Sequence, residues 1–119
     1  MPKTIAIVDD DEAVRDSLSA LLASAGYAFR AFASGAAFVE ATGKSRPDGV
    51  ILDHRMSGMT GVELAERLKS ERPGTVIVMI SGNLTSAERA RAESAGVAAI
   101  LEKPFSDDAL IAAIETALE

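Results

Sequence analysis

Four short apolar runs without polar–apolar alternation constrain the fold of this chain more than any other feature. They occupy residues 5–8, 50–52, 76–80 and 98–101, and a fifth, more mixed run at residues 27–32 contains Arg30. Uninterrupted runs rich in Val and Ile are typical of strands that are buried on both faces of a parallel sheet. The pattern therefore predicts such a sheet, with helices covering both of its faces.

Segments with helical spacing of apolar residues lie between these runs. Three clear stripes are formed by Val14, Leu18, Leu21, Leu22 and Ala25, by Val62, Ala65 and Leu68, and by Leu110, Ile111, Ile114 and Leu118. Gly26 and Pro73-Gly74 follow the first two stripes and are typical helix stops. Residues 85–94 carry mostly alanines on their apolar side, which predicts a loosely held helix because alanine buries little area. The polar residues 42–47 are expected to form a loop.

The alternation of strand and helix predicts an α/β fold with a doubly wound parallel sheet. The length of 119 residues suits one domain, so we expect a single domain over residues 1–119. The chain has no cysteine and only one histidine, His54, which excludes disulfides, thiolate zinc sites and multi-histidine metal centres.

The net charge of −6 argues against direct nucleic-acid binding, which needs clustered Lys and Arg. No apolar run approaches the roughly 20 residues that a membrane span needs, and the N-terminal run leads straight into acidic residues, unlike a signal peptide. We therefore expect a soluble, cytoplasmic domain without a membrane partner.

Polar side chains follow the predicted strands where these strands end. Asp9 and Asp10 follow the first strand, Asp53 the third, Ser81 the fourth and Lys103 the fifth. Each has an ordinary structural role as well, as a helix cap, a turn former or a strand exit. Their coincidence at one end of the sheet favours a site, because ligands of open parallel sheets bind outside the carboxyl ends of the strands.

Carboxylates gathered at such an edge repel one another, by roughly 4 kcal/mol for two charges about 4 Å apart at an effective dielectric constant of about 20. Either one of them is protonated or a cation lies among them. Oxygen-only ligands at an open site favour Mg²⁺. A carboxylate beside Mg²⁺ and a lysine can act as a nucleophile toward phosphorus and form an aspartyl phosphate. Ser81 could donate a hydrogen bond to the phosphoryl oxygens.

Four short motifs carry a resemblance to a known family. They are Val8-Asp9-Asp10, Asp53-His54-Arg55-Met56 with Gly61, Ile80-Ser81-Gly82 and Lys103-Pro104-Phe105. In this order and spacing they resemble the receiver domain of bacterial two-component response regulators, over essentially the whole chain. The sequences around Asp53 and Lys103 look most like those of receivers of the nitrogen-fixation regulator type, which usually precede a helix-turn-helix DNA-binding domain.

The resemblance implies a flavodoxin-like, five-stranded parallel sheet in the order 2-1-3-4-5 with helices on both faces. It also implies that Asp53 accepts a phosphoryl group from the phosphohistidine of a sensor histidine kinase or phosphotransfer protein. Asp10 and Asp53 would bind the Mg²⁺ cofactor by their side chains, Arg55 by its main-chain carbonyl and Asp9 through water. Such a domain assists its own phosphorylation and dephosphorylation but is not a turnover enzyme.

The resemblance further implies that Lys103 pairs with the phosphoryl group, that Ser81 moves toward it as the switch, and that the bond before Pro104 is cis. The fourth helix, fifth strand and fifth helix would then control an output domain or partner protein, with residues 81–94 reorganising most. A DNA-binding domain in a longer chain is one such output, and a homodimer of the phosphorylated form is another expectation.

Two positions depart from the family pattern. Ser57 stands where receivers commonly have proline, which implies a less rigid loop after Asp53. Ile100 is the second expected switch position. Receivers usually have an aromatic residue there, whose ring swings inward, so the aromatic half of the usual switch is not expected to operate in this chain. Two alternatives remain open: a receiver-like interaction module that works without phosphorylation, and a phosphatase of the haloacid dehalogenase type, whose acidic pair would be expected last in the chain.

Overall fold

Strands and helices alternate along the chain in the computed structural model, which describes residues 2–43 and 46–119. Over these residues the elements are β1 (Thr4–Val8), α1 (Glu12–Ser24), β2 (Ala28–Phe32), α2 (Gly35–Ala41), β3 (Gly49–Asp53), α3 (Gly61–Glu71), β4 (Val76–Ser81), α4 (Ser86–Ser94), β5 (Ala99–Glu102) and α5 (Asp107–Leu118). The loop expected over residues 42–47 includes Lys44 and Ser45, which lie outside the described residues. Its described part contains neither helix nor strand.

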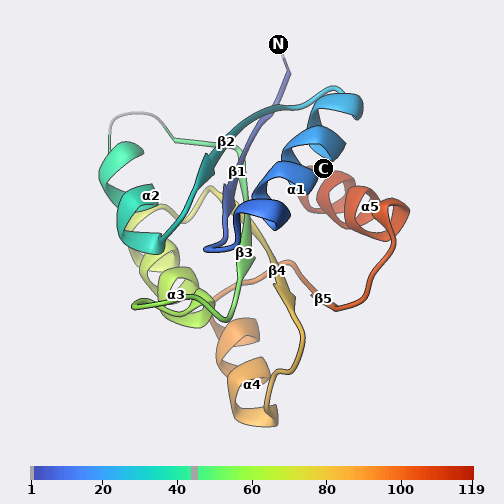
Figure 1. Ribbon diagram of the computed structural model, residues 1–119. Coiled ribbons are helices and arrows are strands. Elements are labelled where there is room, and N and C mark those ends of the chain that lie inside the picture. The colour runs from blue at the N-terminus through green and yellow to red at the C-terminus, as the bar shows by residue number, and fades with distance from the viewer. Residues whose placement is uncertain (1, 44–45) are drawn as a thin grey trace.

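The strands form one parallel sheet in the order β2-β1-β3-β4-β5, which confirms the predicted topology. The helices α1 and α5 lie on one face of the sheet, whereas α2, α3 and α4 lie toward the other (Figure 1). Each face has its own buried apolar cluster, one containing Leu18 and Leu110 and the other containing Phe38 and Leu64. All five residues of β3 are buried, as the run of apolar residues predicts for a strand covered on both sides.

The order of the strands determines where a ligand can reach the sheet. The chain leaves β1 toward β2 on one side, and β3 lies on the other side of β1. In doubly wound sheets this reversal opens a crevice outside the carboxyl ends of the two strands concerned. Asp53 is the last residue of β3, and Asp9 comes directly after Val8 at the end of β1.

One helix had no stripe of apolar residues to predict it, and one strand begins later than expected. The helix α2 has seven residues, too few for a clear apolar stripe, and it is positioned by buried Phe38 and by the Ser34 hydroxyl, which accepts a hydrogen bond from the N–H of Ala37. Strand β2 begins at Ala28 rather than at Tyr27, and most of its residues are exposed because it is an edge strand.

The helix α4 is short of apolar anchors, as its alanines predict. Within α4, all of which the structure describes, Ala92 is the only fully buried residue. Its first turn is closed by a capping box, in which Thr85 and Glu88 exchange side-chain and main-chain hydrogen bonds. None of the described helices combines the length and the apolar character needed to cross a membrane.

Candidate functional site

Three carboxylates meet at the carboxyl ends of β1 and β3. Asp9, Asp10 and Asp53 each offer an oxygen atom, and these atoms lie within 4.8 Å of one another. Asp9 and Asp53 are buried, with 1% and 6% of their surface exposed, whereas Asp10 lies at the surface. The sequence predicted this convergence, because parallel topology brings the ends of the two strands together.

Asp9 is held in place with one of its oxygens left without a partner. Its Oδ1 accepts a hydrogen bond from the N–H of Asp11 at 2.9 Å, and its carbonyl oxygen accepts one from the guanidinium of Arg15 at 2.8 Å. Its Oδ2 is buried and has no hydrogen-bond partner among the described residues. Burial, together with the charge of Asp53, raises the pKa of the Asp9 carboxyl above its ordinary value, against the lowering effect of the Asp11 N–H.

This arrangement fits a metal ion. A buried, unpartnered carboxylate oxygen is costly, and here it belongs to a group of carboxylates that repel one another. A cation among them would relieve both costs at once. The donor set consists of oxygen atoms only, which suits a hard cation. The acidic cluster can therefore hold a metal ion.

Lys103 brings a positive charge to the same edge. Its Nζ lies 3.4 Å from Asp53 Oδ1, and the lysine side chain is half-exposed whereas the carboxylate is buried. Lys103 directly follows β5, and the bond between Lys103 and Pro104 is cis, as expected. The contact joins two residues 50 positions apart in the sequence, so it depends on the order of the strands in the sheet.

Ser81 lies at the end of β4, next to Asp53 in the sheet. Asp53 is in register with Ile80, the residue before Ser81. The serine side chain is fully buried, and its Oγ accepts a hydrogen bond from the N–H of Asn83 at 3.2 Å. Ser81 therefore ends its strand at the same edge of the sheet as Asp53, as expected from the sequence.

Arg55 connects the two loops that border the site. Its guanidinium donates a hydrogen bond to the carbonyl oxygen of Asn83 at 2.8 Å. The role of its own main-chain carbonyl as a metal ligand stays a prediction. Ile100 is half-buried on β5 and packs against the apolar cluster on the α3 and α4 side of the sheet, where an aliphatic side chain fits without a polar partner.

Ser57 contacts the acidic cluster, which sequence reasoning missed. Its N–H donates to Asp10 Oδ2 at 3.1 Å, and its hydroxyl lies 3.4 Å from the same oxygen. The available signal was the absence of proline at this position, because proline has no N–H to donate. One oxygen of the exposed carboxylate is therefore partly occupied before a cation binds.

We expect Ser57→Pro to bind Mg²⁺ several-fold more tightly than the wild type. The substitution removes the N–H donor from Asp10 Oδ2, and one such hydrogen bond is worth about 1 kcal/mol. Isothermal titration calorimetry measures the affinity, with Ser57→Ala as the matched control. Ser57→Ala keeps the N–H and should stay close to the wild type. Unchanged or weaker binding by Ser57→Pro would contradict this account.

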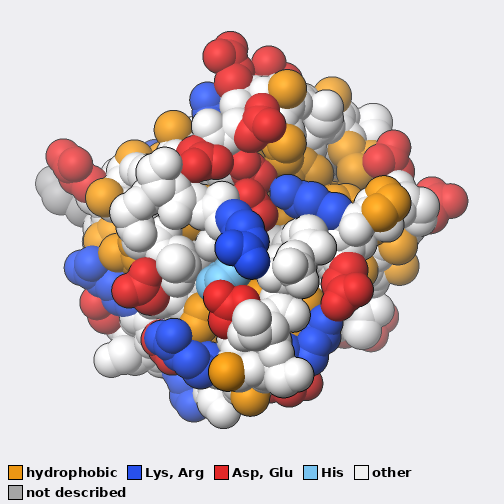
Figure 2. Space-filling view, turned by 60° about the horizontal axis from the view of Figure 1, so that its bottom comes forward, with side chains coloured by type: hydrophobic (Ala, Val, Ile, Leu, Met, Phe, Trp, Pro, Cys, Tyr) orange, Lys and Arg blue, Asp and Glu red, His pale blue; other side chains and the backbone are white. Residues whose placement is uncertain are grey.

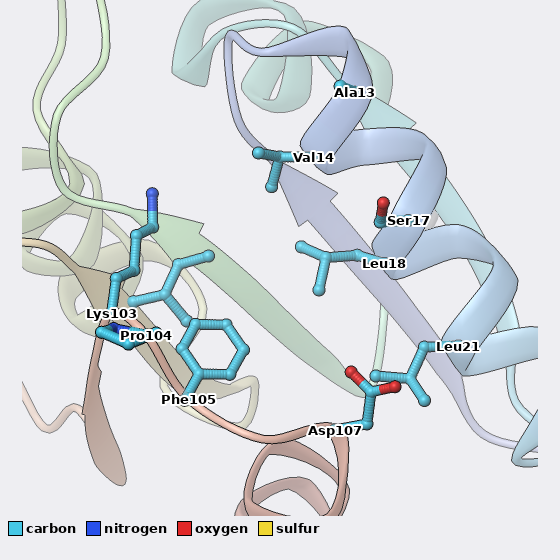
Figure 3. A pocket seen from close by; sticks show the side chains of 10 residues that line it. Ala13, Val14, Ser17, Leu18, Leu21, Lys103, Pro104, Phe105 and Asp107 are labelled. Carbon is cyan, nitrogen blue, oxygen red and sulfur yellow. The ribbon is translucent and has the colours of Figure 1, made fainter.

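An apolar groove lies beside the acidic cluster, between α1 and the segment that follows β5. It has a volume of about 430 Å³, and its walls include Val14, Leu18 and Leu21 on one side and Pro104 and Phe105 on the other. Figure 3 shows the Phe105 ring facing α1 across this groove, with Lys103 at one end.

Around the site, acidic and basic side chains gather near the pale-blue histidine (Figure 2).

Comparisons with known proteins agree with this geometry. The family described as "Response regulator receiver domain" matches residues 5–115. The transcriptional regulatory protein FixJ of Bradyrhizobium diazoefficiens is 39% identical over 114 residues, which cover 96% of this chain and 56% of the relative. FixJ of Azorhizobium caulinodans is 36% identical over 120 residues, which cover 99% of this chain and 57% of the relative. The chain thus spans about half the length of these curated relatives.

Solved structures show the same fold. A CheY-like receiver domain protein from Methanospirillum hungatei has a TM-score of 0.95 and 28% identity, covering 99% of this chain and 94% of that one. The chemotaxis protein CheY4 of Vibrio cholerae has a TM-score of 0.91 and 27% identity, covering 99% and 100% of the two chains. By its family match, its relatives and its fold, this chain belongs to the receiver domains of two-component response regulators.

Proposed function

We propose that Asp53 is the phosphoacceptor of this receiver domain. Its carboxylate would attack the phosphorus of a phosphohistidine on a sensor histidine kinase or phosphotransfer protein. The new O–P bond forms as the N–P bond breaks, and the electron pair of that bond leaves with the imidazole. The observation that carries the proposal is the buried carboxylate of Asp53, placed within the acidic cluster and 3.4 Å from Lys103 Nζ.

The surrounding side chains would stabilise the charge of the transferring phosphoryl group in different ways. Lys103 is close enough to neutralise charge on the phosphoryl oxygens, and Ser81 can turn its hydroxyl toward them as the switch residue. Asp10 and Asp53 would hold Mg²⁺ by their side chains and Arg55 by its carbonyl oxygen, with Asp9 acting through water. When bound, Mg²⁺ supplies positive charge beside the transferring phosphoryl group. Each transfer modifies Asp53 once, so the domain acts as a stoichiometric acceptor rather than a turnover enzyme.

Intact-mass spectrometry tests this function directly. The protein is incubated with acetyl phosphate, with and without Mg²⁺, as the wild type and as Asp53→Asn. We expect one phosphoryl adduct that requires both Mg²⁺ and Asp53. The matched control is Asp16→Asn, which removes one exposed carboxylate from α1 and should leave the labelling unchanged.

A negative result requires a second donor before it counts. If neither acetyl phosphate nor a phosphorylated kinase labels the wild type, the phosphoacceptor function is wrong. A receiver-like interaction module that works without phosphorylation would then be the better reading. The departure at Ile100, an aliphatic residue packed on the core, is the observation that favours this second function.

The partners follow from the same placement. A kinase or phosphotransfer protein would dock beside Lys103, where the apolar groove between α1 and Phe105 borders the acidic cluster. The FixJ relatives are transcriptional regulators about twice as long as the matched region, so the proposed output is a DNA-binding domain in a longer chain or a separate protein. The face formed by α4, β5 and α5 would control this output. The phosphorylated form would be a homodimer, and the protein would act in the cytoplasm.

A further inference from the structure

The position of α4 depends on polar contacts more than on apolar packing. Within its fully described length only Ala92 is buried. Arg91 pairs with Glu66 of α3 and Arg89 with Glu102 of β5, both at 2.6 Å, but these four side chains are 40–64% exposed. Solvent-exposed ion pairs contribute little to stability. They are therefore weak anchors for the helix.

One contact of α4 is different because it reaches into the protein beside Asp53. His54 Nε2 lies 2.9 Å from Glu88 Oε2, and only 5% of the imidazole side chain is exposed. His54 is the residue after Asp53, and Glu88 belongs to the first turn of α4. Figure 2 shows the histidine with an acidic side chain directly beside it.

The chemistry of the imidazole determines the direction of this hydrogen bond. The N–H of Val62 points at Nδ1 from 3.4 Å, so Nδ1 is the nitrogen without a proton. Nε2 then carries the proton and donates a hydrogen bond to the carboxylate of Glu88. Hydrogen bonds from Thr85 and His54 lower the pKa of Glu88 to about 2, so its carboxylate is ionised at neutral pH.

The main chain of His54 is fixed as firmly as its ring. Its N–H donates to the carbonyl of Ile80 in β4, and its carbonyl accepts from the N–H of Gly61 in α3. Glu88 uses its other oxygen, Oε1, to accept from the N–H of Thr85 at the start of α4. One continuous set of hydrogen bonds therefore joins the residue after Asp53 to the N-terminal turn of α4.

We propose that His54 is a positioning residue, which couples the loop after Asp53 to α4 through its hydrogen bond with Glu88. A shift of this loop would weaken or move the bond and release the first turn of the helix. The proposal rests on the proposed function for its signal, since phosphorylation of Asp53 is what would shift the loop. It also supplies a route from the site to α4 that needs no aromatic residue at Ile100.

The first test uses the unphosphorylated protein, so that it decides the coupling even if Asp53 is never labelled. Hydrogen exchange of the amides of α4 is measured in the wild type, His54→Phe, His54→Gln and Glu88→Ala. Loss of a hydrogen bond to a charged group should accelerate exchange about tenfold in His54→Phe. Exchange should accelerate further in Glu88→Ala, which also loses the hydrogen bond from the N–H of Thr85. His54→Gln should stay near the wild type, because its amide can donate from a position close to that of Nε2.

Several outcomes would overturn the coupling. Unchanged exchange in His54→Phe would overturn it, and so would equal acceleration in His54→Phe and His54→Gln, which would indicate packing rather than a hydrogen bond. The double variant His54→Phe/Glu88→Ala should exchange no faster than Glu88→Ala alone, since the two residues act through one bond. If the acceleration of exchange in the double variant equals the product of the accelerations in the two single variants, the result counts against the proposal. Glu88→Ala keeps the test decisive if His54→Phe does not fold. Thr85→Ala breaks the other hydrogen bond of the capping box and shows how far a weakened cap alone accelerates exchange.

The second test asks whether phosphorylation uses this contact. In protein labelled on Asp53, exchange of α4 should accelerate in the wild type and should change little in His54→Phe, whose contact is already lost. An equal response in the two proteins would show that the signal reaches α4 by another route. If neither acetyl phosphate nor a phosphorylated kinase labels Asp53 in the wild type, the proposed function is wrong, and the result of the first test still stands.

Discussion

Replacing Asp9 with asparagine is expected to raise the free energy of unfolding of the metal-free protein by about 1–2 kcal/mol. Asp9 is buried with Oδ2 unpartnered among the described residues, and its charge adds to that of Asp53. Asparagine has nearly the same shape and can still accept the hydrogen bond from the N–H of Asp11. It removes one buried charge from the cluster, so the repulsion falls without leaving a cavity.

The same variant should respond less to Mg²⁺. A ligand that binds only the folded state stabilises it by about 2.7 kcal/mol at a free concentration of about 100 times Kd. Loss of a residue that acts on a metal through water typically weakens binding about 10–100-fold, which would reduce the gain to about 0.4–1.4 kcal/mol at the same concentration. Urea unfolding in EDTA and in Mg²⁺ measures both effects in the wild type and in Asp9→Asn.

The matched control for Asp9→Asn is Asp16→Asn, which changes the net charge equally but lies exposed on α1. It should leave stability in EDTA and the gain in Mg²⁺ close to the wild-type values. If Asp9→Asn lost stability in EDTA, the carboxylate would be better satisfied than its unpartnered oxygen indicates. If Mg²⁺ raised the free energy of unfolding of Asp9→Asn as much as that of the wild type, Asp9 would not take part in metal binding.

The elements that sequence reasoning predicted best are those whose burial is uniform. Strands β1, β3 and β4 are covered on both faces, so their apolar runs are distinctive. The edge strand β2 and the short helix α2 were harder, because an exposed strand and a seven-residue helix need few apolar residues. Phe38 is the one buried side chain of α2, whose residues the structure describes in full, and a single buried side chain leaves no periodic signal.

The site divides in a similar way. The meeting of Asp9, Asp53 and Lys103 follows from the topology, since each residue lies at the end of a parallel strand. The contact between Ser57 and Asp10 spans 47 residues, and that between His54 and Glu88 spans 34. Such contacts depend on the relative placement of loops and helices, which no local pattern of residues encodes.

Gly61→Ala is expected to destabilise the protein by about 1–3 kcal/mol, because the change overpacks a rigid contact. Gly61 is the first residue of α3, and a Cβ atom there would lie 2.7 Å from the Cα of His54 and 2.8 Å from the carbonyl oxygen of Asp53. Both neighbours are main-chain atoms of the site itself, so they cannot rotate away. Urea unfolding measures the loss, and labelling of Asp53 should become slower as the loop is displaced.

Two other glycines separate this clash from the general effect of adding a methyl group. Gly74 has no heavy atom within 4 Å of the added Cβ, so Gly74→Ala should be neutral or stabilise by about 0.4–1 kcal/mol through the unfolded chain. Gly35 begins α2 as Gly61 begins α3, but its nearest neighbour is the flexible end of Met59 at 3.2 Å. Gly35→Ala should therefore lower the free energy of unfolding much less than Gly61→Ala does. If the two variants lose the same free energy, the close approach of α3 to the loop after Asp53 is not what requires glycine at position 61.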